Sequence, residues 1–378
     1  MKSAVIAGFV RSPFTPANKS PLAAVRPDEL TAQVVRALIE RTKIRAEDIE
    51  DLLLGCAFPE GEQGLNLARL VGIMAGLPHS VAGATINRFC GSSMQSVHSA
   101  AGAIAIGAGE AFICAGIESM SRVPMMGFNP MPHPGLVKEF PQAYMSMGQT
   151  AENVARKYQV TREQQQDLAV ASHCKAAAAQ QAGLLKAEIV PIKTRDGMVD
   201  SDGCIRADTS QQALSTLAPA FDAAGTVTAG TSSPLTDGAS AVLVCTEDYA
   251  VRNKLEILAR LKSVAVAGCA PEIMGIGPVA ATQKALKRAG IAMTDIDIIE
   301  LNEAFASQAL ACVRDLGIDL AKTNIDGGAL ALGHPLGATG ARITGKAASL
   351  LKREGKRYAL ATQCIGGGQG IATILEAV

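Results

Sequence analysis

The apolar residues of this chain fall into short unbroken runs that do not alternate with polar residues. Such runs occur at residues 4–10, 112–114, 238–243 and 358–360. Strands that are covered by helices on both faces of a sheet show this pattern. Amphipathic segments lie between the runs, and they predict helices over residues 28–41, 91–106, 278–289, 302–316 and 337–353. Together these elements predict an α/β fold.

Segments near the start of the chain recur in the same order near its end. The matching pairs are residues 4–9 with 264–269, 43–54 with 290–301, Cys90 with His334, 112–114 with 358–360, and 238–243 with 368–373. In the middle three pairs, the two members are separated by nearly the same number of residues. Five matches in one order indicate an internal duplication, in which each half reads strand–helix–strand–helix–strand–helix–strand.

The stretch between the two halves matches neither of them. It opens with a loop rich in Met, Pro and Gly over residues 120–147, and we expect helices over 150–158 and 162–185. Thr161 and Gln164 have the spacing of a capping box before the second of these helices. We therefore expect an N-terminal half (1–117 with 236–257), an inserted lid-like loop domain (118–235) and a C-terminal half (258–378).

Charge and cysteine content narrow the classes of function. The 35 basic residues balance the 35 acidic residues, which argues against a nucleic-acid groove or an anionic membrane surface as partner. No apolar stretch reaches membrane-spanning length without Gly or polar interruptions, so we expect no membrane insertion. The nine cysteines contain no C-x-x-C pair, and the five histidines do not fall at zinc-ligand spacing. We expect reduced thiols, a cytoplasmic protein and no metal site.

Cys90 is the first candidate for chemistry, because it stands where an apolar run gives way to an expected helix. A thiol at a helix N-terminus faces unpaired N–H groups and the positive end of the helix dipole. We therefore expect its pKa to lie below the free value of about 8.5. The alternative for a lone cysteine is a small buried residue.

Three further polar residues join this candidate. His334 lies at the joint equivalent to Cys90, so packing of the halves about a pseudo-twofold axis would bring both helix N-termini to one centre. Cys364 ends the strand that follows, and the glycines after it offer N–H groups for an oxyanion hole. Taken alone, His334 is equally well explained as a structural histidine beside a proline turn. Asn302 is expected to begin a helix, where a plain N-cap is the alternative.

Four blocks of the sequence resemble the signature motifs of the thiolase family. They are Asn87–Ser93 (NRFCGSS), Asn302–Ala306 (NEAFA), Gly327–Gly340 (GGALALGHPLGATG) and Cys364–Gly370 (CIGGGQG), and blocks at 147–153 and 228–233 also match. The resemblance spans essentially the whole chain. It implies the thiolase fold, in which two βαβαβαββ halves with helices covering the sheets carry an inserted loop domain that binds coenzyme A.

The resemblance also implies a role for each residue of the site. Cys90 would be the nucleophile that attacks the 3-keto carbon of an acyl-CoA, with His334 as its base. Cys364 would protonate the departing carbanion, or remove the α-proton in the condensing direction. Asn302 would hold a water that, together with His334, stabilises the enolate. The backbone N–H groups of Cys90 and Gly366 would hold the thioester oxygen.

For coenzyme A, the resemblance carries Ser233 onto a pantetheine contact, Arg206 onto an adenine contact and Met147 onto the pantetheine entry. Coenzyme A would be a co-substrate, and no tightly bound cofactor is expected. Arg206 on its own would be interpreted as a surface arginine. Methionines could form an adaptable wall for an acyl chain, with core filling as the alternative, at positions 120, 125, 126, 131, 145 and 147.

Within the family, two features favour a degradative enzyme. Ser146 stands where short-chain acetoacetyl-CoA thiolases tend to carry His, and residues 123–135 and 231–233 resemble degradative 3-ketoacyl-CoA thiolases. We expect an acyltransferase of fatty-acid β-oxidation that cleaves 3-ketoacyl-CoA with CoA to acetyl-CoA and a shortened acyl-CoA. The alternative is synthesis of acetoacetyl-CoA from two acetyl-CoA molecules.

Two other classes fit the residues poorly. A non-catalytic CoA-binding scaffold would have lost at least one of Cys90, Asn302, His334 and Cys364, and all four are present. A ketosynthase would not carry the second cysteine. The resemblance further implies a homodimer or homotetramer, with a hydratase/dehydrogenase subunit as an optional partner.

Overall fold

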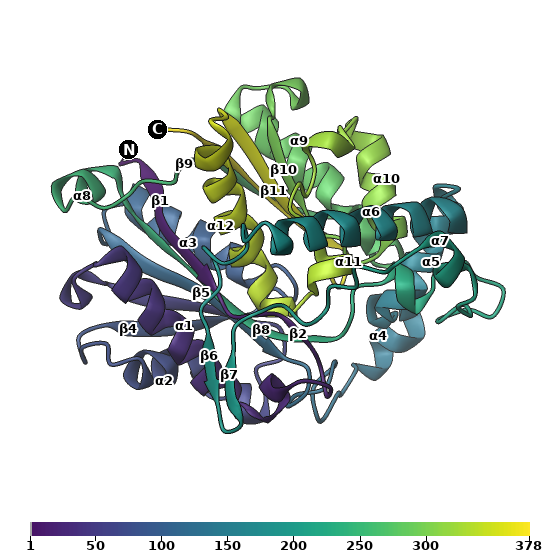
Figure 1. Ribbon diagram of the computed structural model, residues 1–378, viewed down its shortest axis with the longest axis horizontal. Helices are drawn as coiled ribbons and strands as arrows, with labels where there is room; N and C mark the ends of the chain where they lie inside the picture. The colour runs from purple at the N-terminus through teal and green to yellow at the C-terminus, as the bar shows by residue number, and fades with distance from the viewer. Residues whose placement is uncertain (1) are drawn as a thin grey trace.

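The computed structural model describes residues 2–378 and contains one mixed sheet of ten strands in the order β10-β11-β12-β9-β1-β8-β5-β3-β4, with β2 paired to β8 (Figure 1). Its strands are β1 (Ala4–Arg11), β2 (Thr15–Pro16), β3 (Asp51–Cys56), β4 (Ala82–Ile86), β5 (Ala111–Ser119), β8 (Thr236–Thr246), β9 (Ala259–Gly268), β10 (Ile298–Leu301), β11 (Tyr358–Ile365) and β12 (Gln369–Glu376). A separate hairpin is formed by β6 (Ile192–Thr194) and β7 (Gly197–Val199).

Twelve helices lie between these strands along residues 2–378, singly or in groups of three (α4–α6 and α10–α12). They are α1 (Pro27–Thr42), α2 (Leu67–Met74), α3 (Ser92–Ala105), α4 (Pro134–Glu139), α5 (Met147–Lys157), α6 (Arg162–Gln181), α7 (Gln211–Ser215), α8 (Glu247–Arg252), α9 (Gly277–Ala289), α10 (Ala306–Leu316), α11 (Ala329–Leu332) and α12 (Leu336–Glu354). No helix in residues 2–378 combines the length and the apolar character that crossing a bilayer requires.

The strand order confirms the duplicated fold. The antiparallel strands β1 and β9 pair at the centre of the sheet. Outward from them, the strand order β8-β5-β3 on one side corresponds to β12-β11-β10 on the other. The register is also repeated. Asp51 pairs with Phe112 in the N-terminal half, and Ile298 pairs with Ala359, the residues 247 positions later (298 against 51, 359 against 112).

The two halves differ at one strand. The N-terminal half follows the expected order, and β4 pairs with β3 in parallel over five residues. In the C-terminal half, the counterpart of β4 is reduced to a single bridge between Ile299 and Thr323, and the short helix α11 follows. The expectation of a strand directly before His334 was therefore wrong.

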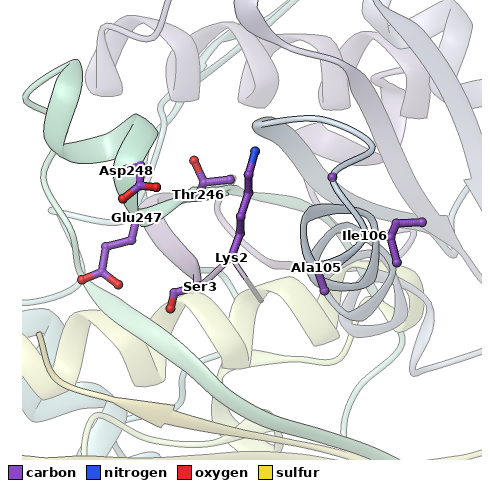
Figure 2. A pocket seen from close by; sticks show the side chains of 8 residues that line it. Lys2, Ser3, Ala105, Ile106, Thr246, Glu247 and Asp248 are labelled. Atoms are coloured by element: carbon purple, nitrogen blue, oxygen red, sulfur yellow. The ribbon is translucent and has the colours of Figure 1, made fainter.

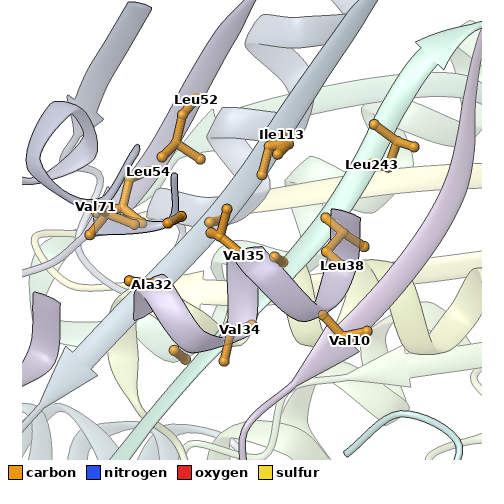
Figure 3. Packing of buried hydrophobic residues seen from close by; sticks show 14 of the residues in the cluster. Val10, Ala32, Val34, Val35, Leu38, Leu52, Leu54, Val71, Ile113 and Leu243 are labelled. Carbon is orange, nitrogen blue, oxygen red and sulfur yellow. The ribbon is translucent and has the colours of Figure 1, made fainter. Parts of the chain in front are cut away.

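Helices cover the sheet in layers. On the outer face of the N-terminal strands, α1 and α2 enclose a core that includes Val35, Leu38, Ile113 and Leu243 (Figure 3). On the outer face of the C-terminal strands, α9 and α10 enclose a second core. Between the two sets of strands lie α3 and α12, which pack against each other and share a third core.

Close contact between α3 and α12 depends on glycine. A Cβ atom at Gly116 of β5 would lie 2.3 Å from the carbonyl oxygen of Gly337 and 2.6 Å from Cβ of Ser93. A Cβ atom at Gly340 of α12 would lie 2.3 Å from the backbone nitrogen of Met94. Any side chain at these positions would push the N-terminal ends of the two helices apart.

The chain leaves the sheet after β5 and returns to it with β8. In between, α6 lies across α10 and α11, and Thr161 and Gln164 form the expected capping box at its start (Figure 1). A buried ion-pair network fastens this segment to both halves, because Glu188 contacts Arg11 of β1 at 2.7 Å and Lys346 of α12 at 2.8 Å. The domain boundaries expected from the sequence remain a prediction.

Candidate active site

Cys90 and His334 occupy the same position at two equivalent helix ends. The helix α3 begins at Ser92 and α12 begins at Leu336, so each residue lies two positions before the first residue of its helix. Cys90 is 8% exposed and His334 is 4% exposed. The packing of α3 on α12 therefore brings a thiol and an imidazole to one end of the central layer.

The backbone at Cys90 is fixed by Gln363, whose side-chain amide donates to the carbonyl oxygen of Cys90. The N–H group of Gly366, in the loop after β11, lies near the thiol and lowers its pKa. The two N–H groups expected to form an oxyanion hole, those of Cys90 and Gly366, are thus both close to the sulfur of Cys90.

The expected low pKa of Cys90 was wrong. The pKa of Cys90 is raised to about 12, mainly by burial; the backbone N–H of Gly366 opposes this rise, and the carboxylate of Glu118 contributes to it. A buried thiolate has no water to hydrate its charge, and this cost exceeds the favourable effect of the helix N-terminus. In the free protein Cys90 is therefore a thiol at neutral pH.

His334 is held as one tautomer of the neutral ring. Its Nδ1 lies 2.6 Å from Oγ1 of Thr339, and that hydroxyl donates to the carbonyl oxygen of Pro335 at 3.0 Å. Because the hydroxyl has a single proton, it accepts the N–H of Nδ1, which leaves the lone pair on Nε2 free. Burial, together with the charge of Arg342, lowers the pKa of His334 to about 3.

Asn302 completes the orientation of this imidazole. Its amide nitrogen lies 3.4 Å from Nε2 of His334, and its own backbone N–H donates to the carbonyl oxygen of Thr362 at 3.0 Å. The expectation that Asn302 begins a helix was wrong, since α10 begins at Ala306. Oδ1 of Asn302 is buried and has no hydrogen-bond partner among residues 2–378, which leaves an acceptor for a water molecule.

Cys364 lies near the end of β11, as expected from the sequence, and is fully buried. Burial raises its pKa, and a charge on Cys90 would raise it further because the two thiols are neighbours. Cys364 packs with Phe305 and Met274, and Met147 lies against the same cluster. It is therefore a protonated thiol beside Cys90.

An apolar cavity of about 460 Å³ opens at Cys90 and Gly366. Its wall is formed mainly by apolar side chains from the loops before and after α4 and from the loops beside Cys90: Phe58, Phe89, Met125, Met126, Pro130, Met131, Pro132, Leu136, Ala143, Tyr144, Met145, Met147 and Leu336. Five of the six methionines singled out in the sequence line it. Met120 instead packs in the small core around Cys90.

The two remaining candidates for binding CoA, Ser233 and Arg206, differ in their burial. Ser233 is half-buried, and its backbone N–H donates to the carbonyl oxygen of Ala304, beside the Asn302 loop. Arg206 is exposed, and its backbone N–H donates to Nδ1 of His173. Neither residue lines the apolar cavity. Their roles in binding CoA remain predictions.

Sequence reasoning missed three residues of the site. Thr339 orients His334, and Gln363 fixes the backbone of Cys90. Glu118 is a fully buried carboxylate close to the nucleophile. A signal for Glu118 was available, because it is an acidic residue at the end of the wholly apolar run 111–117.

A larger hollow of about 620 Å³ lies elsewhere, beside the N-terminus. Figure 2 shows Lys2 in this hollow, between Thr246 and Ala105. Ala105 ends α3, so the hollow lies about one helix length, roughly 20 Å, from the end of α3 that carries Cys90. It is open and contains none of the candidate site residues.

Comparison with known proteins decides the family. Residues 4–248 match the thiolase N-terminal domain, and residues 255–377 match the thiolase C-terminal domain. The chain belongs to the thiolase family. It is 47% identical over 389 residues to a 3-ketoacyl-CoA thiolase of Bacillus subtilis (strain 168) and 48% identical over 389 residues to one of Shewanella loihica, with full coverage of both chains in each case.

Solved structures agree with this assignment. The crystal structure of human mitochondrial 3-ketoacyl-CoA thiolase is similar with a TM-score of 0.92 at 36% identity, and the match covers 100% of this chain and 99% of that one. The human enzyme in complex with CoA matches with the same TM-score and identity, with 98% of its chain covered. The thiolase fold and the acyltransferase class expected from the motif blocks are confirmed.

Replacement of Thr339 tests the orientation of His334. We expect Thr339→Val to leave the buried N–H of Nδ1 without an acceptor, so that the lone pair is no longer fixed on Nε2. The turnover number should fall about 100-fold, the lower range of what a positioned base contributes. Thr339→Ser keeps the hydroxyl and should retain most activity. Equal losses in both variants, measured by steady-state kinetics, would contradict this role.

Proposed function

We propose that this protein cleaves 3-ketoacyl-CoA with coenzyme A, which yields acetyl-CoA and an acyl-CoA shortened by two carbons. The observation that carries the proposal is an apolar cavity that opens at the protonated thiol of Cys90, with the protonated thiol of Cys364 as its neighbour and the neutral imidazole of His334 at the equivalent end of the packed helix α12. The names of the full-length bacterial relatives support the same substrate class.

In the first half-reaction, the sulfur of Cys90 attacks the 3-keto carbon while its proton passes to Nε2 of His334. A neutral histidine with its lone pair on Nε2 suits this step. The oxyanion forms next to the sulfur, close to the N–H groups of Cys90 and Gly366, and each such donor contributes roughly 3 kcal/mol. Re-formation of the carbonyl then breaks the bond between C2 and C3.

The electrons of that bond leave with acetyl-CoA as an enolate. We propose that the thiol of Cys364 donates its proton to C2, and that a water held by Oδ1 of Asn302 stabilises the enolate oxygen. In the second half-reaction, the CoA thiol gives its proton to the Cys364 thiolate and attacks the acyl group on Cys90. The departing Cys90 thiolate recovers its proton from His334, and every group returns to its starting state.

Coenzyme A binding is assigned by resemblance to Ser233, Arg206 and Met147. Two of these have support from their positions, since Met147 lines the cavity and Ser233 lies beside the Asn302 loop. Arg206 is exposed and free to meet a phosphorylated nucleotide. The similar human enzyme has been solved with CoA bound.

Cys364→Ala tests the division of labour between the two thiols. Without this proton donor, cleavage of 3-ketoacyl-CoA should fall by at least 100-fold, the lower range for general acid catalysis. Cys90 should still accept an acyl group from acetyl-CoA, and mass spectrometry of the intact protein should show the added mass. Loss of this acylation together with cleavage would contradict the assignment. Cys90→Ser is the control that should abolish acylation.

The chain-length profile separates the degradative proposal from acetoacetyl-CoA synthesis. An apolar cavity of about 460 Å³ with flexible methionines favours acyl chains longer than four carbons. We expect kcat/KM for 3-ketohexadecanoyl-CoA to equal or exceed that for acetoacetyl-CoA. An enzyme that cleaves acetoacetyl-CoA but no longer substrate would instead support the short-chain alternative.

We also propose a homodimer or homotetramer. The edge strand β4 pairs only with β3 among the described residues, and Leu65 beside it is 89% exposed. The side-chain amide of Asn66 donates a hydrogen bond to the carbonyl oxygen of Gly83 in β4, which fixes the neighbouring Leu65 next to the edge of the sheet.

Leu65→Lys should weaken assembly, because it places a charge in the expected contact between copies. Ile106→Lys is the matched control, since Ile106 is 83% exposed at the end of α3. Sedimentation velocity should show dissociation only for the first variant. A monomeric parent protein would contradict the proposal.

The cellular setting is a further proposal. All nine cysteines are free, which supports a reducing compartment such as the cytoplasm. The pairing with a hydratase/dehydrogenase subunit stays a prediction, and co-purification from a cell extract would test it.

A further inference from the structure

Glu118 is a buried carboxylate that the steps above do not use. It lies at the end of β5 and is fully buried. Four nitrogen donors meet it. The N–H groups of Ala57 and Gly337 each lie 2.9 Å from Oε2, while the N–H of Phe58 and the amide of Gln63 lie 3.3 Å and 2.8 Å from Oε1.

These donors require an ionised carboxylate. Backbone N–H groups cannot accept a proton, and the amide of Gln63 is fixed in orientation because its Oε1 accepts the N–H of Ser119 at 2.7 Å. A protonated Glu118 would leave one donor facing an O–H group. Burial raises the pKa of Glu118, and the four hydrogen bonds oppose that rise.

The carboxylate connects the two halves at the site. Ala57 and Phe58 follow β3 of the N-terminal half, whereas Gly337 is the second residue of α12 and lies three positions after His334. The contact at Gly337 is tight, since a Cβ atom there would lie 2.4 Å from the carbonyl oxygen of Ile117. Glu118 thus fixes the start of α12, and with it the position of His334, against the half that carries Cys90.

The fold itself does not require a charge at this position. The repeated register makes Ile365 of β11 the counterpart of Glu118, because Glu118 pairs with Gly238 and Ile365 pairs with Gln369. A Cβ atom at Gly91 would lie 2.5 Å from Ile365, so the N-terminus of α3 packs on an apolar side chain. The same joint is therefore apolar in one half and carries a buried negative charge in the other.

We propose that Glu118 is a positioning residue that holds the start of α12, and with it His334, against the half that carries Cys90. The positioning follows from its hydrogen bond with the N–H of Gly337 and rests on the proposed function. The charge of Glu118 has a second, smaller effect, because it adds to the rise in the pKa of Cys90 that burial mainly causes. The other titratable groups facing Cys90 are His334 before α12 and Cys364 of β11, both of which are neutral in the free protein. On the side of β3, Cys56 contacts Glu118 and is also protonated.

The two effects predict opposite changes in Glu118→Gln. The amide has no charge, so the pKa of Cys90 should fall and its alkylation by iodoacetamide at pH 7 should rise roughly three- to tenfold, half to one pKa unit. The amide NH₂ also faces two N–H donors, so α12 should shift and kcat for 3-ketoacyl-CoA cleavage should fall at least tenfold. Mass spectrometry of the Cys90 peptide measures alkylation separately from the other cysteines.

Two variants provide the controls. Glu118→Asp keeps the charge but has too short a side chain to reach all four donors, so kcat should fall while alkylation of Cys90 stays at the parent rate. Asp51→Asn removes a carboxylate at the opposite end of β3, and both readouts should stay unchanged. Unfolding of Glu118→Gln would raise alkylation of the other buried cysteines as well, such as Cys114 and Cys312, and mass spectrometry of their peptides detects it.

Unchanged kcat in Glu118→Gln would overturn the proposal, and unchanged alkylation would overturn the effect of the Glu118 charge on Cys90. If the parent enzyme cleaves no 3-ketoacyl-CoA yet alkylation rises in Glu118→Gln, the proposed function fails while the effect of the charge on Cys90 stands.

Discussion

The structure depends on the close approach of α3 and α12 at their N-terminal ends. This approach is possible because Gly116, Gly337 and Gly340 have no side chain where the two helices and β5 meet. It sets the distance between Cys90 and His334, which belong to halves far apart in the sequence. The layered cores on either side hold the helices together, but the glycines decide how near the two reactive groups come.

Burial then sets the resting state of the site. It raises the pKa of Cys90 to about 12 and lowers that of His334 to about 3, so both groups are neutral when no substrate is bound. An ion pair in this region would lack the hydration that stabilises separated charges. In the proposed mechanism, the proton moves only when a substrate supplies an oxyanion for the N–H groups of Cys90 and Gly366 to stabilise.

Much of the fold was predictable because the duplication preserves spacing. A strand register repeated at 247 residues is visible as sequence similarity, and helix ends carry local signals such as the capping box at Thr161. The shrunken third strand near Thr323 and the late start of α10 were not predictable. Both depend on contacts with distant segments, and a short polar loop gives no periodic pattern.

The site was predictable in its residues more than in its electrostatics. Cys90, Asn302, His334 and Cys364 stand in motif blocks, and the fold brings them together. The sign of the pKa shift at Cys90 was wrong, because a sequence shows that a helix follows but not how deeply the sulfur is buried. Thr339 and Glu118 were missed for a similar reason, since each acts through a contact that only the folded chain creates.

The pseudo-twofold relation of Cys90 and His334 restricts how such a centre can arise. Two identical halves joined as separate subunits would present the same side chain from both joints, either a pair of thiols or a pair of imidazoles. Covalent linkage of the two copies lets them diverge, so that one joint carries a thiol and the other an imidazole. Asn302 and Cys364 have diverged in the same way, because their counterparts in the N-terminal half are Gly55 and Ile117, which carry no reactive group.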